Sequence, residues 1–163
     1  MHHAVYPGSF DPITNGHLDI IHRGCQIFDR LTVAVLRNPS KTPLFSTIER
    51  IGMIQEATRD MPHIISIDSF DGLLVDYAER IDADVILRGL RAVSDFEFEF
   101  QLSLMNRRLK PTINTVYLMA CADLTYLSSG LVKEIAALGG SVAGLVPDCT
   151  LSMLLKKMSR NTE

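Results

Sequence analysis

A ten-residue segment near the start of the chain constrains the fold most. It spans Gly8–His17, reads GSFDPITNGH, and follows a short apolar run at His3–Tyr6. The helical pattern after it has one inner face, formed by Leu18, Ile21, Cys25 and Phe28. A loop that joins the carboxyl end of a strand to a helix is where an open α/β sheet binds anions, because free amides and the helix dipole point at the ligand. The segment therefore predicts an anion site on an α/β sheet.

The side chains of this loop fit chemistry on phosphate. Gly8 and Gly16 permit tight turns and close approach of the backbone to a ligand. His17 lies in the first helical turn and Ser9 on the facing side, so amides, a hydroxyl and an imidazole surround one point. The alternative is a plain strand–helix connection with an incidental histidine, and the two common phosphate-loop patterns are absent. The placement directly after a strand favours the functional interpretation.

Composition restricts the class of protein. The 163 residues predict one domain, 1–163, and a hydrophobic fraction of 47% can fill a core on both faces of a sheet. A net charge of −3 argues against a broad nucleic-acid surface, and no apolar run is long enough for a membrane span. Pro7-Gly8 interrupts the first apolar stretch too early for a secretory signal peptide. The widely spaced Cys25, Cys121 and Cys149 indicate reduced thiols in a cytoplasmic protein.

Short apolar runs alternate with helical patterns along the chain. The predicted strands are His3–Tyr6, Leu31–Leu36, Ile64–Asp68, Val85–Leu87 and Thr115–Met119. The predicted helices are Gly16–Phe28, Thr47–Arg59, Gly72–Ile81, Asp95–Leu109, Ser129–Leu138 and Cys149–Met158. Ser46 and Glu49 form a capping box before the second helix. Nearly continuous apolar strands alternating with helices predict an α/β fold with a doubly wound, parallel, five-stranded sheet.

Basic side chains follow two of the predicted strands. Lys41 lies between two prolines after the second strand, where a solvated charge and a phosphate ligand are equally good explanations. Arg88 and Arg91 follow the fourth strand, separated by a predicted glycine turn, and guanidinium forks match phosphate oxygens in pairs. We favour phosphate binding over the alternative that the arginines pair with Asp95 or Glu97.

Two further segments carry open alternatives. Ser128-Ser129-Gly130 precedes a predicted helix, where one serine is an ordinary N-cap and two serines with a glycine can also hold phosphate oxygens. Phe96, Phe98 and Phe100 spread around one helix, so this segment is either buried on several sides or part of a subunit contact. Glu99 among them is an exposed charge or an acceptor for a nucleobase amine.

The sequence contains donors and cations but no Ser-His-Asp order, paired-carboxylate signature or metal-ligand cluster. Positioning and charge stabilisation are what phosphoryl or nucleotidyl transfer requires of a protein. The motifs resemble those of bacterial phosphopantetheine adenylyltransferases, in the family's order and over essentially the whole chain. They are Gly8–His17, Asn38–Lys41, Ile86–Arg91, Asp95–Glu97 and Ser128–Glu134.

The resemblance implies a Rossmann-like nucleotidyltransferase fold and a specific reaction. AMP would pass from ATP to 4′-phosphopantetheine, giving dephospho-coenzyme A and pyrophosphate. Further implications are Mg²⁺ bridging the ATP phosphates, a cytoplasmic homohexamer, and coenzyme A as a feedback inhibitor. No nucleic-acid or membrane partner is expected.

The resemblance also assigns roles by position. His17 corresponds to a histidine that stabilises the transition state. The implied phosphopantetheine contacts are Ser9, Lys41, Leu74 and Arg88. The implied ATP contacts are Ser9, Phe10, His17, Gly89, Leu90, Arg91, Glu99, Leu124, Thr125, Tyr126, Leu127, Ser128, Ser129 and Gly130. The chain departs from the family's pattern at Ser9 (often threonine), Leu124 (an aromatic in some members) and Gly130 (often Ser or Thr).

Two other functions remain open at this point. A different nucleotidyltransferase would load a pyridine mononucleotide or an alcohol phosphate, and the first loop does not discriminate because the superfamily shares it. A regulatory module would bind ATP without releasing pyrophosphate and would tolerate loss of His17. Lys41, Leu74 and the Arg88–Arg91 segment are the features that favour the phosphopantetheine enzyme.

Overall fold

The computed structural model describes residues 2–37, 42–61, 65–91 and 93–160. Its centre is one five-stranded sheet in the order β3-β2-β1-β4-β5, with every neighbouring pair parallel. The strands are β1 His3–Gly8, β2 Arg30–Leu36, β3 Ile65–Phe70, β4 Val85–Leu90 and β5 Asn114–Met119. The predicted doubly wound, parallel, five-stranded α/β fold is confirmed.

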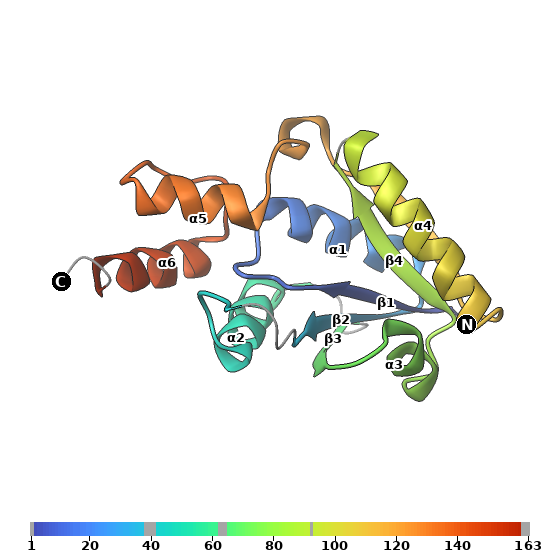
Figure 1. The fold of residues 1–163 in the computed structure, drawn as a ribbon. Helices are drawn as coiled ribbons and strands as arrows, with labels where there is room; N and C mark the ends of the chain where they lie inside the picture. Colours follow the sequence, from blue (N-terminus) through green and yellow to red (C-terminus); the bar gives the residue numbers. More distant parts are fainter. Residues whose placement is uncertain (1, 38–41, 62–64, 92, 161–163) are drawn as a thin grey trace.

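Within the described residues, six α-helices and one short 3₁₀ turn connect and flank the strands (Figure 1). Their bounds are α1 Asn15–Ile27, α2 Thr47–Ala57, α3 Leu74–Arg80, α4 Val93–Leu109, η1 Ala122–Leu124, α5 Ser129–Ala137 and α6 Asp148–Arg160. The predicted capping box is present at α2, because Ser46 accepts from the Glu49 amide while the Glu49 carboxylate accepts from the Ser46 amide.

The chain reverses its direction of winding next to β1. The first three strands step outward from β1 to β3, and the chain then returns to place β4 on the other side of β1. Ala4 and Val5 of β1 pair with Val85 and Ile86 of β4. The carboxyl ends of β1 and β4 therefore flank the crevice in which open α/β sheets bind ligands.

The two faces of the sheet bury separate cores. One contains Tyr6, Leu31 and Leu87, together with Ile20 and Ile21 of α1, and it extends to α2, α5 and α6. The other contains alternate strand residues and the buried side of α3: Val5, Ala34, Phe70, Val75, Tyr77, Ala78, Ala83, Ile86 and Ile113. Nearly every side chain of β1 and β2 is buried, as expected for strands covered on both faces. In Figure 1, α5 and α6 lie side by side beyond the carboxyl ends of the strands.

The structure corrects several local predictions. β4 continues to Leu90, because Arg88, Gly89 and Leu90 pair in register with Tyr117, Leu118 and Met119 of β5. The predicted glycine turn is therefore wrong, and Arg88 lies within the strand. On α1, Ile21 and Phe28 are buried as predicted, whereas Leu18 and Cys25 are only partly buried.

The aromatic segment of α4 also differs from one expectation. Phe96, Phe98 and Phe100 are 46%, 66% and 48% exposed, so burial on several sides of this chain is wrong. Glu99 is buried at 8% exposure, so its description as an exposed charge is wrong too. Among the described helices, none has the length and apolar character that crossing a membrane would need.

Candidate active site

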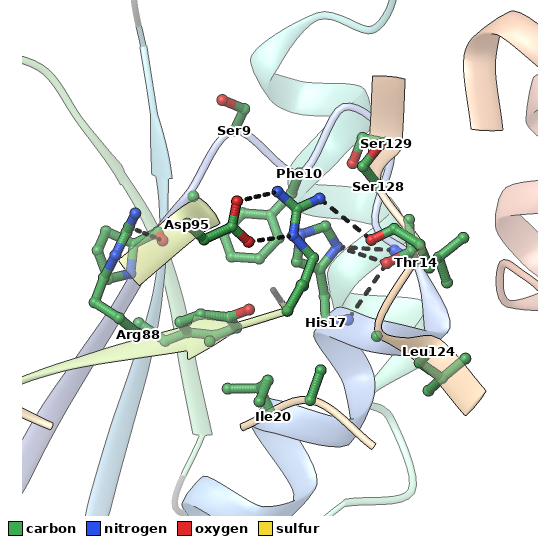
Figure 2. A pocket seen from close by; sticks show the side chains of 18 of the residues that line it. Ser9, Phe10, Thr14, His17, Ile20, Arg88, Asp95, Leu124, Ser128 and Ser129 are labelled. Carbon is green, nitrogen blue, oxygen red and sulfur yellow. Dashed lines mark hydrogen bonds and ion pairs between the residues drawn. The ribbon is translucent and has the colours of Figure 1, made fainter. Parts of the chain in front are cut away.

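A cleft of about 690 Å³ opens at the carboxyl ends of β1 and β4. Five segments contribute to its wall: the end of β1 with the following loop, the start of α1, the end of β4, the start of α4, and the connection from β5 into α5. In Figure 2, Arg88 and Asp95 lie on one side, Leu124, Ser128 and Ser129 on the other, and Phe10 and His17 between them. The cleft is at the crevice that the winding of the sheet predicts.

The start of α1 fixes the ring of His17 through an unusual capping box. Thr14 is the N-cap, and its hydroxyl oxygen accepts from the His17 amide at 3.4 Å. In return the Thr14 amide donates to Nδ1 of His17 at 3.0 Å, in the place that a Glu or Gln side chain commonly takes. Because an amide N–H can only donate, Nδ1 is the acceptor and the ring proton of the neutral imidazole sits on Nε2.

The surroundings of His17 keep its imidazole neutral. Burial in the cleft wall, with smaller contributions from the positive charges of Arg91 and Arg88, lowers the pKa of His17 to about 4. Nε2 makes no hydrogen bond to the described residues, whereas Nδ1 makes two. His17 therefore presents one N–H donor to the cleft and no positive charge at neutral pH.

Aromatic rings pack against His17 and hold its ring in this position. Phe10 packs edge-on against His17, with ring centroids 5.0 Å apart, and against Tyr6 at 5.4 Å. Phe10 adopts a φ of 47°, in the left-handed region, which is unfavourable for a bulky residue and persists where the surroundings enforce it. A Cβ atom at Gly8 would lie 2.9 Å from the Phe10 ring, so this position requires glycine. The loop is thus shaped around one ring that supports His17.

The two arginines of the cleft are held by carboxylates of α4. Arg88 donates through Nε to Oε2 of Glu99 at 2.8 Å and through Nη2 to Oε1, while its Nη1 donates to the Pro7 carbonyl at 3.2 Å. Burial opposes the charge of Arg88, but the hydrogen bonds and attraction of Glu99 outweigh it and raise the pKa of Arg88. Arg91 donates to both carboxylate oxygens of Asp95, at 3.1 and 3.4 Å.

Asp95 was one of the two alternative partners considered for these arginines, and the structure confirms it for Arg91. Arg91 also donates to the Leu127 carbonyl at 3.3 Å, which links β4 to the connection before α5. Each pair leaves the guanidinium next to the cleft, since Arg88 and Arg91 both line it. Ion pairing and exposure to a ligand therefore coexist here, and the carboxylates fix where the cations point.

The opposite wall is the start of α5. The Ser128 hydroxyl oxygen caps this helix by accepting from the Leu131 amide at 3.1 Å, as an ordinary N-cap does. The Ser129 hydroxyl donates to the Pro12 carbonyl at 2.7 Å and so ties α5 to the first loop. Ser129 and Gly130 of this first turn line the same cleft as Gly16 and His17 of α1, so two helix N-termini border it.

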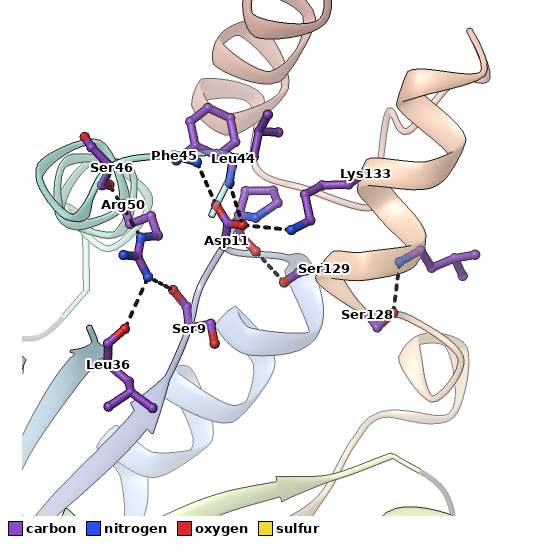
Figure 3. A network of polar contacts seen from close by, with 12 residues as sticks. Ser9, Asp11, Leu36, Leu44, Phe45, Ser46, Arg50, Ser128, Ser129 and Lys133 are labelled. Carbon is purple, nitrogen blue, oxygen red and sulfur yellow. Dashed lines mark hydrogen bonds and ion pairs between the residues drawn. The ribbon is translucent and has the colours of Figure 1, made fainter. Parts of the chain in front are cut away.

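A polar network behind the first loop holds it in place (Figure 3). The buried Asp11 carboxylate accepts from the Leu44 amide at 3.0 Å, the Phe45 amide at 2.8 Å and Nζ of Lys133 at 2.7 Å. Arg50, also buried, donates to the Ser9 carbonyl at 2.8 Å. Two distant parts of the chain, residues 44–50 and helix α5, are thereby bonded to the segment that carries Ser9 and His17.

Most of the predicted site residues come together. Those that line the cleft are Ser9, Phe10, His17, Arg88, Gly89, Arg91, Glu99, Leu124, Leu127, Ser128, Ser129 and Gly130. Four others do not line it: Leu90, Thr125, Tyr126 and Leu74, the last of which packs with the core on the other face of the sheet. Lys41 lies outside the described residues.

Sequence reasoning missed other members of the cleft wall. They include Tyr6, Ile20, Phe98 and Ala120. Tyr6 is embedded in an apolar strand and gives no separate signal, whereas Asp95 was named only as a possible partner of the arginines. Within the described ranges, no group of three or more His, Cys, Asp or Glu side chains could hold a metal ion.

Comparison with known proteins agrees with this geometry. The cytidylyltransferase-like family model matches residues 5–135. A phosphopantetheine adenylyltransferase of Caldanaerobacter subterraneus subsp. tengcongensis is 52% identical over 97% of this chain and 98% of its own length. One from Oleidesulfovibrio alaskensis is 56% identical over 94% and 90%, respectively.

A solved structure shows the same fold at low sequence identity. It is a Vibrio parahaemolyticus protein assigned as a nicotinate-nucleotide adenylyltransferase, with a TM-score of 0.70, 14% identity, and coverage of 95% of this chain and 99% of that one. At this identity the likeness concerns the fold alone. The family model and the relatives carry the assignment: this chain belongs to the cytidylyltransferase-like family and, within it, to the phosphopantetheine adenylyltransferases.

Proposed function

We propose that this protein transfers AMP from ATP to 4′-phosphopantetheine and releases dephospho-coenzyme A and pyrophosphate. The single observation that carries the reaction type is the N–H of a neutral His17 beside the start of α1, in a cleft with two arginines. The acceptor substrate is supported by relatives that are 52–56% identical and named phosphopantetheine adenylyltransferases.

The chemistry needs no nucleophile from the protein. An oxygen of the phosphopantetheine phosphate attacks the α-phosphorus of ATP, the new P–O bond forms, and the bond to the pyrophosphate oxygen breaks with its electron pair leaving on pyrophosphate. Both reactants are anions, so the protein must bring them together and offset their repulsion. A cleft that offers donors and cations but no activated serine or cysteine fits that task.

His17 would act as a neutral hydrogen-bond donor. In the transition state, negative charge grows on the oxygens around the α-phosphorus, and a fixed N–H donor stabilises it without reorganisation. The Thr14 amide holds the ring tautomer that keeps the proton on Nε2. The free amides at the start of α1 would add to the same effect.

The remaining predicted residues would divide between the substrates. Arg88, with Lys41 and Ser9, would hold the attacking phosphate, and Leu74 would contact the pantetheine arm. Arg91 and the Ser128–Gly130 turn would hold the leaving pyrophosphate. The ion pairs to Glu99 and Asp95 support these roles, since a fixed guanidinium loses little entropy on binding an oxyanion. In this scheme Glu99 would act through Arg88, since both of its carboxylate oxygens accept from that guanidinium.

Mg²⁺ would enter with ATP and neutralise part of the triphosphate charge. The carboxylates of the cleft, Asp95 and Glu99, are engaged by arginines, so the protein offers few direct ligands. That donor set fits an ion held mainly by phosphate oxygens and water, as Mg²⁺ often is at nucleotide sites.

We further propose a homohexamer, with coenzyme A as an inhibitor that fits the same cleft because it shares the adenylate and pantetheine parts of the product. The exposed phenylalanines of α4, with Leu104, Met105 and Leu109 between 47% and 54% exposed, support a subunit contact on this helix. Light scattering of the purified protein measures the mass, and a monomer at micromolar concentration would contradict the assembly.

The decisive assay of the reaction mixes purified protein, ATP, Mg²⁺ and 4′-phosphopantetheine and detects dephospho-coenzyme A by mass. We expect product together with stoichiometric pyrophosphate. A parallel panel with a pyridine mononucleotide and an alcohol phosphate tests the other nucleotidyltransferases. ATP binding with no pyrophosphate from any acceptor would identify a binding module instead.

A further inference from the structure

The hydroxyl of Tyr6 is a polar group of the cleft to which the proposed mechanism gives no role. The Tyr6 side chain is 94% buried, since only 6% of it is exposed, and it lies near the end of β1. The hydroxyls of Tyr77 and Tyr117 donate to the Asp68 carboxylate and the Glu99 carbonyl, respectively. Within the described residues, the Tyr6 hydroxyl has no hydrogen-bond partner. A hydroxyl with no protein partner at the edge of a cleft is available to a ligand.

The hydroxyl opens into the cleft. Tyr6 lines the cleft. Among the described residues, every side-chain nitrogen or oxygen that is sealed from solvent has a hydrogen-bond partner. Since the Tyr6 oxygen has no partner, it is not sealed from solvent. The Tyr6 oxygen is therefore reached from the cleft. A Cβ atom at Gly89 would lie 3.7 Å from the Tyr6 oxygen and only 3.1 Å from a side-chain carbon of Ile20, so glycine at this position keeps the cleft wall between Tyr6 and Ile20 from being overcrowded.

The ring of Tyr6 is held rigidly, which fixes the direction of the hydroxyl. Phe10 packs edge-on against it at 5.4 Å, and the His17 ring lies 6.5 Å away. Burial raises the pKa of Tyr6 above its ordinary value, although Arg88 and Arg91 act in the opposite direction. The phenol therefore keeps its proton across the physiological pH range and can donate a hydrogen bond to an oxygen atom of a ligand.

The face of the sheet on which Tyr6 lies indicates which substrate its hydroxyl contacts. Tyr6 belongs to the core on the α1 face, as does Leu127 from the connection before α5, and Leu124 packs against that core. Leu74, the residue expected to contact pantetheine, belongs to the opposite core. The Tyr6 ring lies 6.5 Å from the His17 ring, and both line the cleft, so the Tyr6 hydroxyl is on the nucleotide side of the proposed reaction.

We propose that Tyr6 is a further nucleotide-binding residue, whose hydroxyl donates a hydrogen bond to an oxygen of ATP bound in the cleft. The proposal rests on the adenylyltransferase function and adds a recognition contact to it. In the absence of ATP the same hydroxyl is hydrated from the cleft, and the rigid ring offers the bond without further ordering.

The substitution Tyr6→Phe removes only the oxygen atom. We expect ATP affinity, measured by calorimetry, to fall about tenfold, as for loss of one hydrogen bond to a charged ligand. The affinity for 4′-phosphopantetheine should stay within about twofold, and the melting temperature without ligand should be unchanged, because no protein hydrogen bond is lost.

Tyr77→Phe is the matched control. It also removes a buried tyrosine hydroxyl, but one bonded to Asp68 outside the cleft. We expect it to lower the melting temperature and leave ATP affinity unchanged. If Tyr6→Phe behaves like this control, or weakens both substrates equally, Tyr6 is a structural residue and the proposal is wrong. Wild-type protein that binds ATP without forming product would overturn the proposed function instead, and the effect of Tyr6→Phe on ATP affinity would still be measurable.

Discussion

The Arg88 guanidinium and the Glu99 carboxylate form a two-point ion pair between β4 and α4, eleven residues apart in the chain. Both side chains are largely buried, with 24% and 10% of their side-chain surface exposed. A buried pair of this kind fixes the direction of the cation more than it stabilises the fold, because desolvation offsets much of the attraction. Glu99 is therefore expected to act on the substrate through Arg88.

The substitution Glu99→Gln tests whether Glu99 orients Arg88 for substrate binding. A neutral amide cannot hold the guanidinium at two points, so we expect the KM for 4′-phosphopantetheine to rise about tenfold, with a smaller change in kcat. Steady-state kinetics at saturating ATP measure both constants. Glu97→Gln, on the exposed side of the same helix, is the control and should behave as wild type. Equal kinetics in the two variants would remove Glu99 from this role.

Asp11 should contribute mainly to stability. Its carboxylate accepts three hydrogen bonds, and Asp11→Asn leaves Lys133 without its counter-ion and presents an NH₂ group where an acceptor is needed. We expect the free energy of unfolding to fall by about 2–3 kcal/mol. Urea denaturation measures it, with the exposed Asp60→Asn as the control.

A second substitution tests the cause of that loss. Removing the orphaned charge with Lys133→Met in the Asp11→Asn background should recover part of the stability, because the two side chains are coupled. Strictly additive effects of the two substitutions would show that the ion pair does not cause the loss.

The lowered pKa of His17 predicts how stability depends on pH. The unfolded chain binds a proton on this histidine near pH 6.5, whereas the folded chain does so only near pH 4. The folded state therefore loses stability as pH falls from about 6.5 to about 4, and this contribution is fully present above that window. We expect His17→Gln to lose less stability than wild type between pH 7 and pH 5, by on the order of 1 kcal/mol. Denaturation curves at the two pH values provide the comparison, and identical losses would contradict it.

The tautomer predicts which amide best replaces His17. The side-chain nitrogen of glutamine reaches near the position of Nε2, and that of asparagine near Nδ1. Because Nε2 carries the donated proton, His17→Gln should retain more activity than His17→Asn, by about tenfold. Single-turnover rates with ATP in excess measure this directly. The reverse order would place the functional proton on Nδ1.

The positions of the strands and helices follow from the sequence because apolar runs and capping residues are local signals. All five strands occur where the apolar runs predict them, and Ser46 and Glu49 form their capping box. The extent of β4 was not predictable, because Gly89 reads locally as a turn. Its pairing with Leu118 of β5 extends the strand through it.

Site residues that lie within one contiguous segment could be predicted from the sequence. Contacts between residues of two separate segments could not. The loop from Gly8 to His17 is contiguous, so its role could be inferred directly. The partner of Arg88 depends on the position of α4 relative to β4, which no local pattern encodes, so the ion pair with Glu99 was not predicted. Tyr6 was overlooked because a tyrosine in an apolar strand looks like any core residue.

The central claim is that a neutral His17 stabilises the transition state of adenylyl transfer. The most direct test is the rate of dephospho-coenzyme A formation by His17→Ala at saturating substrates, beside His22→Ala on the exposed side of the same helix. We predict that kcat falls by about 10²–10³ in His17→Ala, with little change in ATP affinity, and that His22→Ala turns over as wild type does. Near-normal turnover by His17→Ala would contradict the claim.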